Sequence, residues 1–320
     1  MIAPSCRHDQ TKRHGYDRKG NQRFRCVLCG KTWLEPRVKP IGDMRIKSDK
    51  AVLCLRLLLE GNSIRSTERI TGVNRNTILT LLETVGRRAL RFWELRMKRL
   101  PAANVEVDEI WGFVGCKEKT RLRLGYGEET GEAYTFTAIE RDTKLLIAWH
   151  TGKRLPADAI VFSGKLQEAT ASRCQVTTDG FVGYATGVPQ AFHYEVDFAQ
   201  LVKIYGKQPE RSAAARYSPA QITEIHKHII CGRPDEDLIC TSHVERQNLN
   251  IRMAVRRMTR LTNAFSKKWQ NHDYHLALYF LYYNFCRVHT TLKSTPAVAA
   301  RIADQQWTVS RLLEELATLD

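Results

Sequence analysis

The sequence predicts a multi-domain chain: a small metal-knuckle-like amino-terminal segment, a helical segment, and a larger α/β domain with a helical tail. Three observations lead to this fold class. Glycines and cysteines punctuate a basic stretch from Cys6 to Trp33, apolar residues recur at helical spacing from Ser48 to Ala89, and side chains alternate as in a strand from Val105 to Val114. A chain of 320 residues is long enough for two or three domains. We place them at residues 1–40, 41–100 and 101–305, with a carboxy-terminal helix over 306–320.

The charge of the chain favours an anionic partner. Lys and Arg outnumber Asp and Glu by 50 to 34, which gives a net charge of +16. Residues 1–47 contain 12 basic and 4 acidic residues, so half of the net charge lies in the first seventh of the chain. A second basic block, residues 251–268, has 6 basic residues and no acidic one. Two basic surfaces are expected, which suit nucleic acid unless both are simply solvated.

Two features predict a cytoplasmic protein that does not enter a membrane. The first six residues lack a charged region followed by an apolar run, and no later stretch reaches the roughly 18 apolar residues of a membrane span. The nine cysteines are scattered, without the density of a disulfide scaffold. Most of them are therefore expected to be reduced.

The helical segment divides into three helices. Ser48 can cap the first, which Gly61 ends, and Asn62 or Ser63 can cap the second, which Gly72 ends. The third follows at once, and its first turn offers three polar side chains: Arg75, Asn76 and Thr77. This helix-turn-helix layout indicates DNA contact through those three residues. An ordinary three-helix packing unit would show the same apolar pattern.

The larger domain begins after Pro101 with three strands, a helix and a fourth strand. We expect the strands at Val105–Val114, Tyr134–Glu140 and Leu145–Thr151, the helix at Pro156–Thr170, and the fourth strand at Cys174–Thr178. Residues 200–241 are polar and mixed, which indicates either an insertion or a partly helical excursion. A basic helix follows from Ser242 to about Thr259, and an aromatic helix from Asp273 to Arg287.

Three carboxylates lie where phosphodiester chemistry would need them. Asp108 is in the middle of an apolar strand, where an uncompensated charge is costly. Asp179 follows the fourth strand, and Glu245 lies one turn into the basic helix. Two divalent cations can stabilise the attacking and leaving oxygens of a phosphoryl displacement, and Mg²⁺ prefers carboxylate ligands. A metal-dependent triad is therefore a hypothesis that the order of these residues supports.

Order and spacing leave alternatives to this triad. Glu106, on the same strand face as Asp108, and the adjacent Glu109 are substitutes for it. The helix face that bears Glu245 continues through Arg252 and Arg256, which we expect to contact phosphates.

Five segments carry a resemblance to a known family: Gly20–Trp33, Val107–Trp111, Thr178–Gly180, His243–Arg252 and Tyr283–His289. In this order they are similar to the insertion sequence 1 family of DDE transposases. The first resembles the family's zinc ribbon, the next three its catalytic segments, and the last a helix that follows the triad. The resemblance implies an RNase H-like catalytic domain in which Asp108, Asp179 and Glu245 hold the metals and Arg252 contacts DNA near the cleavage point.

The same resemblance implies a function and partners. The chain would be a transposase that cleaves the ends of an insertion element and joins them to target DNA. It would use two Mg²⁺ ions, for which Mn²⁺ could substitute. Its substrates would be terminal inverted repeats and target DNA, bound by a homo-oligomer in the bacterial nucleoid.

The zinc-ribbon-like segment departs from the family pattern in one place. Family ribbons begin Cys-Pro-x-Cys, where this chain reads Ala-Pro-Ser-Cys and lacks the first cysteine. Structural zinc prefers four ligands. The sequence supplies three secure candidates, Cys6, Cys26 and Cys29, with His8 or His14 as the fourth. The alternative is a degenerate ribbon that holds weak zinc or none.

Two other classes of function stay open. A non-catalytic, sequence-specific DNA-binding protein derived from a transposase would keep the ribbon and the helices but would have no need for the acid in the strand. A structure-selective RNase H-like nuclease would keep the triad, and an assay of strand transfer would distinguish it.

Overall fold

The computed structural model describes residues 3, 6–18, 20–34, 39–206, 222–260 and 262–319. The chain forms two compact units, Met1–Pro40 and Ile41–Asp320. Among the helices in these described ranges, none combines the length and the apolar character needed to span a bilayer.

The described part of the amino-terminal unit is a small antiparallel sheet with almost no apolar core. Its strands β1 (Thr11–Tyr16), β2 (Gln22–Cys26) and β3 (Thr32–Leu34) pair in chain order. The rings of Phe24 and Trp33 stack at a centroid distance of 6.1 Å. Among the residues of this unit that the structure describes, only Ala3 and Cys26 are buried. So small a core among the described residues is typical of units that a bound metal or a disulfide stabilises.

The larger unit is built on a six-stranded mixed sheet with strand order β6-β5-β4-β7-β8-β9. Its strands are β4 (Asn104–Val114), β5 (Gly131–Glu140), β6 (Leu146–Gly152), β7 (Gln175–Thr178), β8 (Asp197–Tyr205) and β9 (Ile222–Cys231). Strands β4, β5 and β6 form an antiparallel meander. Strand β7 runs parallel to both β4 and β8, and β9 pairs antiparallel with β8. Strand β4 therefore lies between the antiparallel and parallel parts of the sheet.

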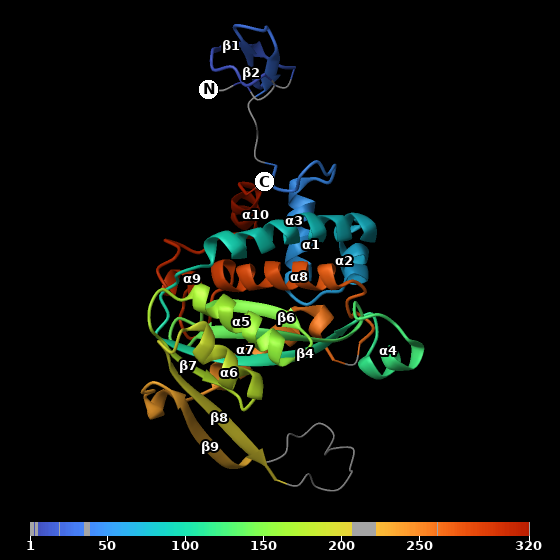
Figure 1. Ribbon diagram of the computed structural model, residues 1–320. Coiled ribbons are helices and arrows are strands. Elements are labelled where there is room, and N and C mark those ends of the chain that lie inside the picture. The colour runs from blue at the N-terminus through green and yellow to red at the C-terminus, as the bar shows by residue number, and fades with distance from the viewer. Residues whose placement is uncertain are drawn as a thin grey trace. The chain divides into compact units, whose positions relative to one another are not determined.

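Helices cover both faces of this sheet (Figure 1). Helices α5 (Pro156–Ala169) and α6 (Val182–Ala191) pack on one face, and α7 (Ser242–Ala254) and α8 (Trp269–Leu281) on the other. The alternation of β4 decides which layer each side chain meets, so Asp108 points toward α7 and Glu109 points away from it. This unit also contains α4 (Glu118–Leu124), α9 (Pro296–Ala299), α10 (Val309–Ala317), a π-helical turn at Tyr282–Cys286, and 3-10 turns at Glu236–Leu238 and Arg256–Met258.

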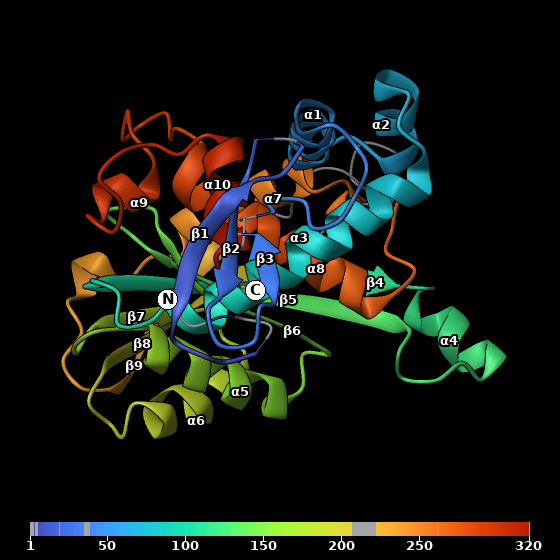
Figure 2. The same cartoon turned by 90° about the horizontal axis from the view of Figure 1, so that it is seen from above.

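Helices α1 (Ser48–Leu59), α2 (Ile64–Thr71) and α3 (Arg75–Arg96) form an outer layer in which α3 runs beside α8 (Figure 2). Trp93 of α3 donates a hydrogen bond from Nε1 to the carbonyl oxygen of Ala277 at 3.2 Å. Its ring also packs edge-on against Trp149 of β6 and Phe280 of α8. One apolar core therefore extends from the helices of segment 41–100 into the sheet.

Several elements differ from the sequence-based expectation. Residues 200–241 were expected to be an insertion or a partly helical excursion. The described residues in this range contain the end of β8, the strand β9 and a 3-10 turn, while 207–221 lie outside the described residues. Nine of the ten residues of β9 are exposed, so its composition carries no alternating apolar signal. Helix α7 ends at Ala254 rather than near Thr259, because the chain tightens into a 3-10 turn. Helices α4 and α6 were not predicted.

A buried histidine pair predicts sensitivity to acid. His275 Nδ1 accepts a hydrogen bond from Arg257 Nε at 3.1 Å, and its Nε2 lies 3.3 Å from the carbonyl oxygen of Leu58. His272 Nδ1 lies 2.9 Å from the Ser266 hydroxyl, which also accepts a bond from Arg257. Burial, reinforced by the charge of Arg257, lowers the pKa of both imidazoles to about 3. Both rings are therefore neutral in the folded protein at pH 5 to 7.

We expect the free energy of unfolding to fall as the pH drops below about 6.5, because the unfolded chain then binds protons that the folded chain excludes. Between pH 7 and pH 5 the loss is about 2 kcal/mol for each histidine. Urea unfolding at both pH values measures this loss. The comparison variant is His275→Gln, whose amide keeps one donor and one acceptor. It should lose less stability on acidification than the wild type, and equal losses would contradict a neutral, buried imidazole at this position.

Candidate active site and metal centres

Two aspartates meet where strands β4 and β7 run side by side. The parallel register pairs Glu106 with Thr177, so two residues further on Asp108 lies level with Asp179. Both side chains line one cavity of about 560 Å³. The pairing of these strands thus brings together two carboxylates that are distant in the sequence.

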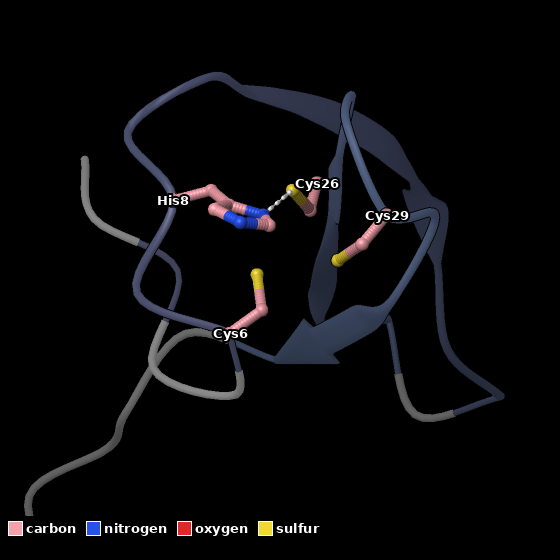
Figure 3. A group of neighbouring side chains, drawn as sticks. All are labelled: Cys6, His8, Cys26 and Cys29. Carbon is pink, nitrogen blue, oxygen red and sulfur yellow. Dashed lines mark hydrogen bonds between the residues drawn. The ribbon is translucent and has the colours of Figure 1, made fainter.

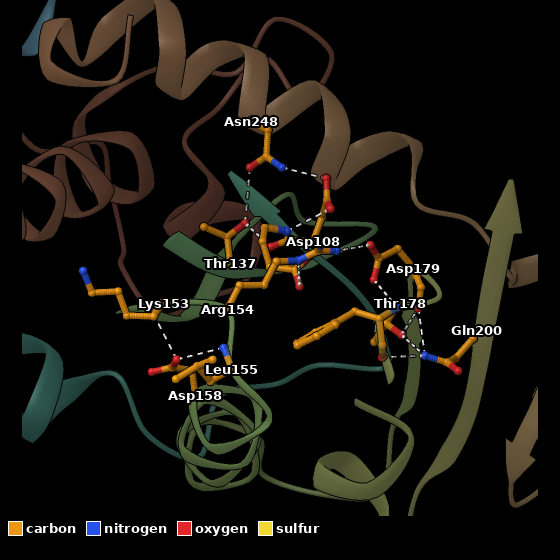
Figure 4. A network of polar contacts seen from close by, with 12 residues as sticks. Asp108, Thr137, Lys153, Arg154, Leu155, Asp158, Thr178, Asp179, Gln200 and Asn248 are labelled. Atoms are coloured by element: carbon orange, nitrogen blue, oxygen red, sulfur yellow. Dashed lines mark hydrogen bonds and ion pairs between the residues drawn. The ribbon is translucent and has the colours of Figure 1, made fainter. Parts of the chain in front are cut away.

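Hydrogen bonds fix the orientation of the Asp108 carboxylate. Its Oδ1 accepts from the Glu109 backbone amide and its Oδ2 from Asn248 Nδ2 of helix α7, each at 2.8 Å (Figure 4). Burial raises the pKa of Asp108 to about 6, and the negative charges of Asp179 and Glu245 add to this shift. The carboxylate is therefore costly to ionise unless a cation joins it.

The Glu109 side chain starts from the opposite face of β4, but its carboxylate lies close to those of Asp108 and Asp179. Its side chain is only 2% exposed. Arg154 contacts it through Nε and contacts Asp179 through Nη2, both at 3.3 Å. Burial, with the charge of Asp179, raises the pKa of Glu109 to about 8. One carboxylate oxygen from each of Asp108, Glu109 and Asp179 lies within 4.8 Å of the other two, and such a set of hard oxygen donors fits a divalent cation such as Mg²⁺.

Glu245 lies in the first turn of α7 and lines the same cavity as Asp108 and Asp179. Its carboxylate forms an ion pair with Lys203 of β8 and accepts a hydrogen bond from Thr241 Oγ1 at 2.7 Å. The close group of three carboxylates described above does not include it. The structure therefore places the three predicted acids around one cavity, with Glu245 held toward Lys203.

Glu106, the other substitute for Asp108, is not one of the described residues that line this cavity. Its carboxylate turns toward the start of α7, where Oε1 lies 2.6 Å from His243 Nδ1. With Cys240 these two side chains form a further group that could hold a metal.

The arginines expected to contact DNA have different surroundings. Arg252 is half-buried, and its guanidinium donates to the carbonyl oxygens of Trp111 and Met258, both at 3.1 Å. Burial lowers the pKa of Arg252 to about 10. This side chain thus ties α7 to β4 and to the following turn. Arg256, at the start of that turn, is half-buried as well.

The polar residues at the start of α3 lie on the surface. Arg75 and Asn76 are exposed, and Thr77 is half-buried. The side chain of Asn74 caps the helix by accepting a hydrogen bond from the Asn76 amide at 2.9 Å. These side chains are thus available to a partner. They lie at the amino end of a helix, and the helix dipole makes this end favourable for anions.

In the amino-terminal unit, three cysteines gather around a histidine (Figure 3). One ligand atom from each of Cys6, His8, Cys26 and Cys29 lies within 4.8 Å of the others, and Cys26 Sγ is 3.4 Å from His8 Nδ1. The backbone amide of Cys29 lowers the pKa of the Cys26 thiol to about 6, which favours the metal-binding thiolate. His14, the other candidate, is exposed on β1.

Arg154 and Lys203, the two cations among the described residues that line the cavity, were not predicted from the sequence. Arg154 has a left-handed backbone (φ 63°), and its guanidinium lies 4.8 Å from the centre of the Phe181 ring. No spacing in the sequence singles it out from the other basic residues. Lys203 lies in the range expected to be an insertion, so its place on a strand beside α7 was not evident.

No protein-family profile and no curated protein matches the chain. A similar solved structure is described as "Cryo-EM structure of piggyBac transposase synaptic complex with hairpin DNA". The match covers 86% of this chain and 72% of that one, with a TM-score of 0.36 and 11% sequence identity. So distant a likeness carries no argument about chemistry, which must come from the residues of this chain.

Proposed function

We propose that this chain is a DDE transposase, similar to those of the insertion sequence 1 family, that cleaves the ends of an insertion element and joins them to target DNA. The observation that carries the proposal is the meeting of Asp108, on β4, with Asp179, directly after the parallel strand β7, while Glu245 faces the same cavity. An antiparallel meander of β4 to β6, followed by parallel β7 and β8, supports an RNase H-like assignment of residues 101–305.

In this proposal each polar residue at the cavity has a distinct role. Asp108 and Asp179 hold the metals, and Asn248 keeps Asp108 turned toward the cavity. Glu245 is the third acidic residue of the metal site, and Lys203 neutralises the Glu245 carboxylate in the metal-free protein. When bound, two Mg²⁺ or Mn²⁺ ions would activate the attacking oxygen and stabilise the leaving oxygen of the phosphodiester.

The same proposal assigns the rest of the chain to DNA. The net charge of +16 suits a polyphosphate. Helices α1 to α3 act as a helix-turn-helix that presents Arg75, Asn76 and Thr77. Further DNA contacts come from Arg252 on α7 and from Arg256 in the turn that follows it. The protein acts as a homo-oligomer on terminal inverted repeats and target DNA, in the bacterial nucleoid.

One observation favours a second candidate, a DNA-binding protein without catalytic activity. Arg154 already pairs with Glu109 and Asp179, and Lys203 with Glu245. Carboxylates that these cations neutralised permanently would bind no metal. The two candidates therefore differ in whether divalent cations bind at the cavity.

An assay with a duplex that carries the element's own ends, a target plasmid and Mg²⁺ tests the proposal. A transposase produces 3′-end cleavage followed by joined products. A structure-selective nuclease produces cleavage alone, and a DNA-binding protein produces neither.

We infer that the amino-terminal unit is a zinc ribbon in which His8 replaces the missing cysteine, since Cys₃His is a common structural zinc site. We expect His8→Ala to lose the zinc and to unfold residues 1–40, because the described part of the unit has almost no core. His14→Ala should keep both the zinc and the fold. Atomic absorption gives the zinc content and limited proteolysis reports on the unit. Equal zinc in the two variants, or none in the wild type, would contradict this assignment.

A further inference from the structure

The residue at the capping position of helix α7 does not cap the helix with its side chain. Thr241 occupies the capping position, but its side chain accepts no bond from the helix and donates instead to Glu245 Oε1. The amides of His243 and Val244, in the first turn, therefore need other acceptors, as unpaired amides at a helix start are costly.

A carboxylate from the sheet supplies them. Oε2 of Glu106 on β4 accepts hydrogen bonds from the amides of His243 at 2.8 Å and Val244 at 3.2 Å. Its Oε1 lies 2.6 Å from His243 Nδ1, so both oxygens are engaged with the start of α7. The Glu106 side chain is 2% exposed. A negative charge there also complements the positive end of the helix dipole.

The position of this contact links it to the cavity. Glu106 and Asp108 lie on the same face of β4, and each binds helix α7, Glu106 at its first turn and Asp108 through Asn248. Glu245 directly follows Val244, which Glu106 holds. The two contacts together fix where Glu245 stands relative to Asp108.

We infer that Glu106 is a positioning residue of the proposed metal site, one that caps α7 from the sheet and thereby holds Glu245 across the cavity from Asp108. This inference rests on the proposed function. It explains why an acid two residues from Asp108 on the same strand face is not itself at the cavity: its oxygens serve the helix.

A double-mutant cycle on the full chain tests the inference with Mn²⁺ as the probe. Glu106→Ala should weaken Mn²⁺ binding about ten-fold, the size seen when residues that orient metal ligands are removed. In a Glu245→Gln background the same change should have no further effect, because Glu106 acts through Glu245. Glu106→Gln, whose amide oxygen can still accept from the helix, should restore part of the affinity.

Two further measurements separate this role from general destabilisation. Hydrogen exchange should show faster exchange of the His243 and Val244 amides in Glu106→Ala, with or without metal. The matched control is Glu140→Ala, which removes another buried carboxylate that accepts backbone amides, those of Asp142 and Thr143 in the β5–β6 turn. It should leave Mn²⁺ affinity unchanged because it does not touch α7.

Unchanged Mn²⁺ affinity in Glu106→Ala would overturn the inference, as would an equal loss in the wild-type and Glu245→Gln backgrounds. If Glu106→Ala does not fold, Glu106→Leu, which fills the same space without an acceptor, is judged by the same two criteria. The proposed function fails separately, and the inference with it, if Asp108→Asn binds Mn²⁺ as tightly as the wild type.

Discussion

Asp108→Asn is expected to slow cleavage and joining by about 10³-fold or more, because bound metal supplies several kcal/mol of transition-state stabilisation. Asp179→Asn and Glu245→Gln should have the same effect. Each change keeps the shape of the side chain and removes the charge that holds a cation. Rates of product formation on end DNA measure the loss, and gel shifts with the same DNA should show that binding persists. A wild-type rate for Asp108→Asn would move the assignment to Glu109, whose oxygen lies in the same close group.

The stability of Asp108→Asn gives an independent test of the Asp108 environment. Burial raises the pKa of Asp108 to about 6, so the folded protein holds this proton more tightly than the unfolded chain. Without metal, stability therefore declines as the pH rises from about 4 to 6, and the asparagine variant escapes this loss. At pH 7.5 it should be more stable than the metal-free wild type by about 1–3 kcal/mol. The control is Asp142→Asn, an exposed residue of the β5–β6 turn, which should change neither stability nor rate.

Gly86→Ala is expected to destabilise the larger unit by about 3 kcal/mol, because overpacking a fixed contact forces the backbone to shift. A Cβ on this residue of α3 would lie 2.3 Å from the Cβ and 2.8 Å from the Cα of Tyr274 on α8. Neither atom can rotate away, so the two helices must separate. Thermal or urea unfolding measures the change.

The matched control for this substitution is Gly164→Ala in α5. A Cβ there meets no atom within 4 Å. Alanine should therefore raise stability by up to about 1 kcal/mol through its better helix propensity. Similar effects at the two glycines would contradict the close packing of α3 on α8.

The sequence predicted what local patterns determine. The alternation around Asp108 predicted strand β4, which begins at Asn104, one residue before the expected start. Pro156 marked the first residue of α5, since proline suits the first helical position. The placement of Asp179 after a short strand followed from the same local reasoning, and β7 ends at Thr178.

The contacts that shape the cavity could not be predicted, because they depend on strand register and helix packing. Whether Glu106 or Asp108 faced the cavity was open, since both lie on one face of a strand. Only the docking of α7 shows that Glu106 meets the helix start. Arg252 was expected to face phosphates because it follows Glu245 on the helix face, but packing against β4 turns its guanidinium onto carbonyl oxygens.

The most direct test of the proposed chemistry uses a pre-cleaved element end with a free 3′-hydroxyl, a target plasmid and the full-length protein. Joined product is measured with Mg²⁺ and with a chelator in its place. We predict joining that requires the divalent cation and disappears in Asp108→Asn, Asp179→Asn and Glu245→Gln. Tight binding of the end by the wild type without any joined product in Mg²⁺ or Mn²⁺ would contradict the proposal.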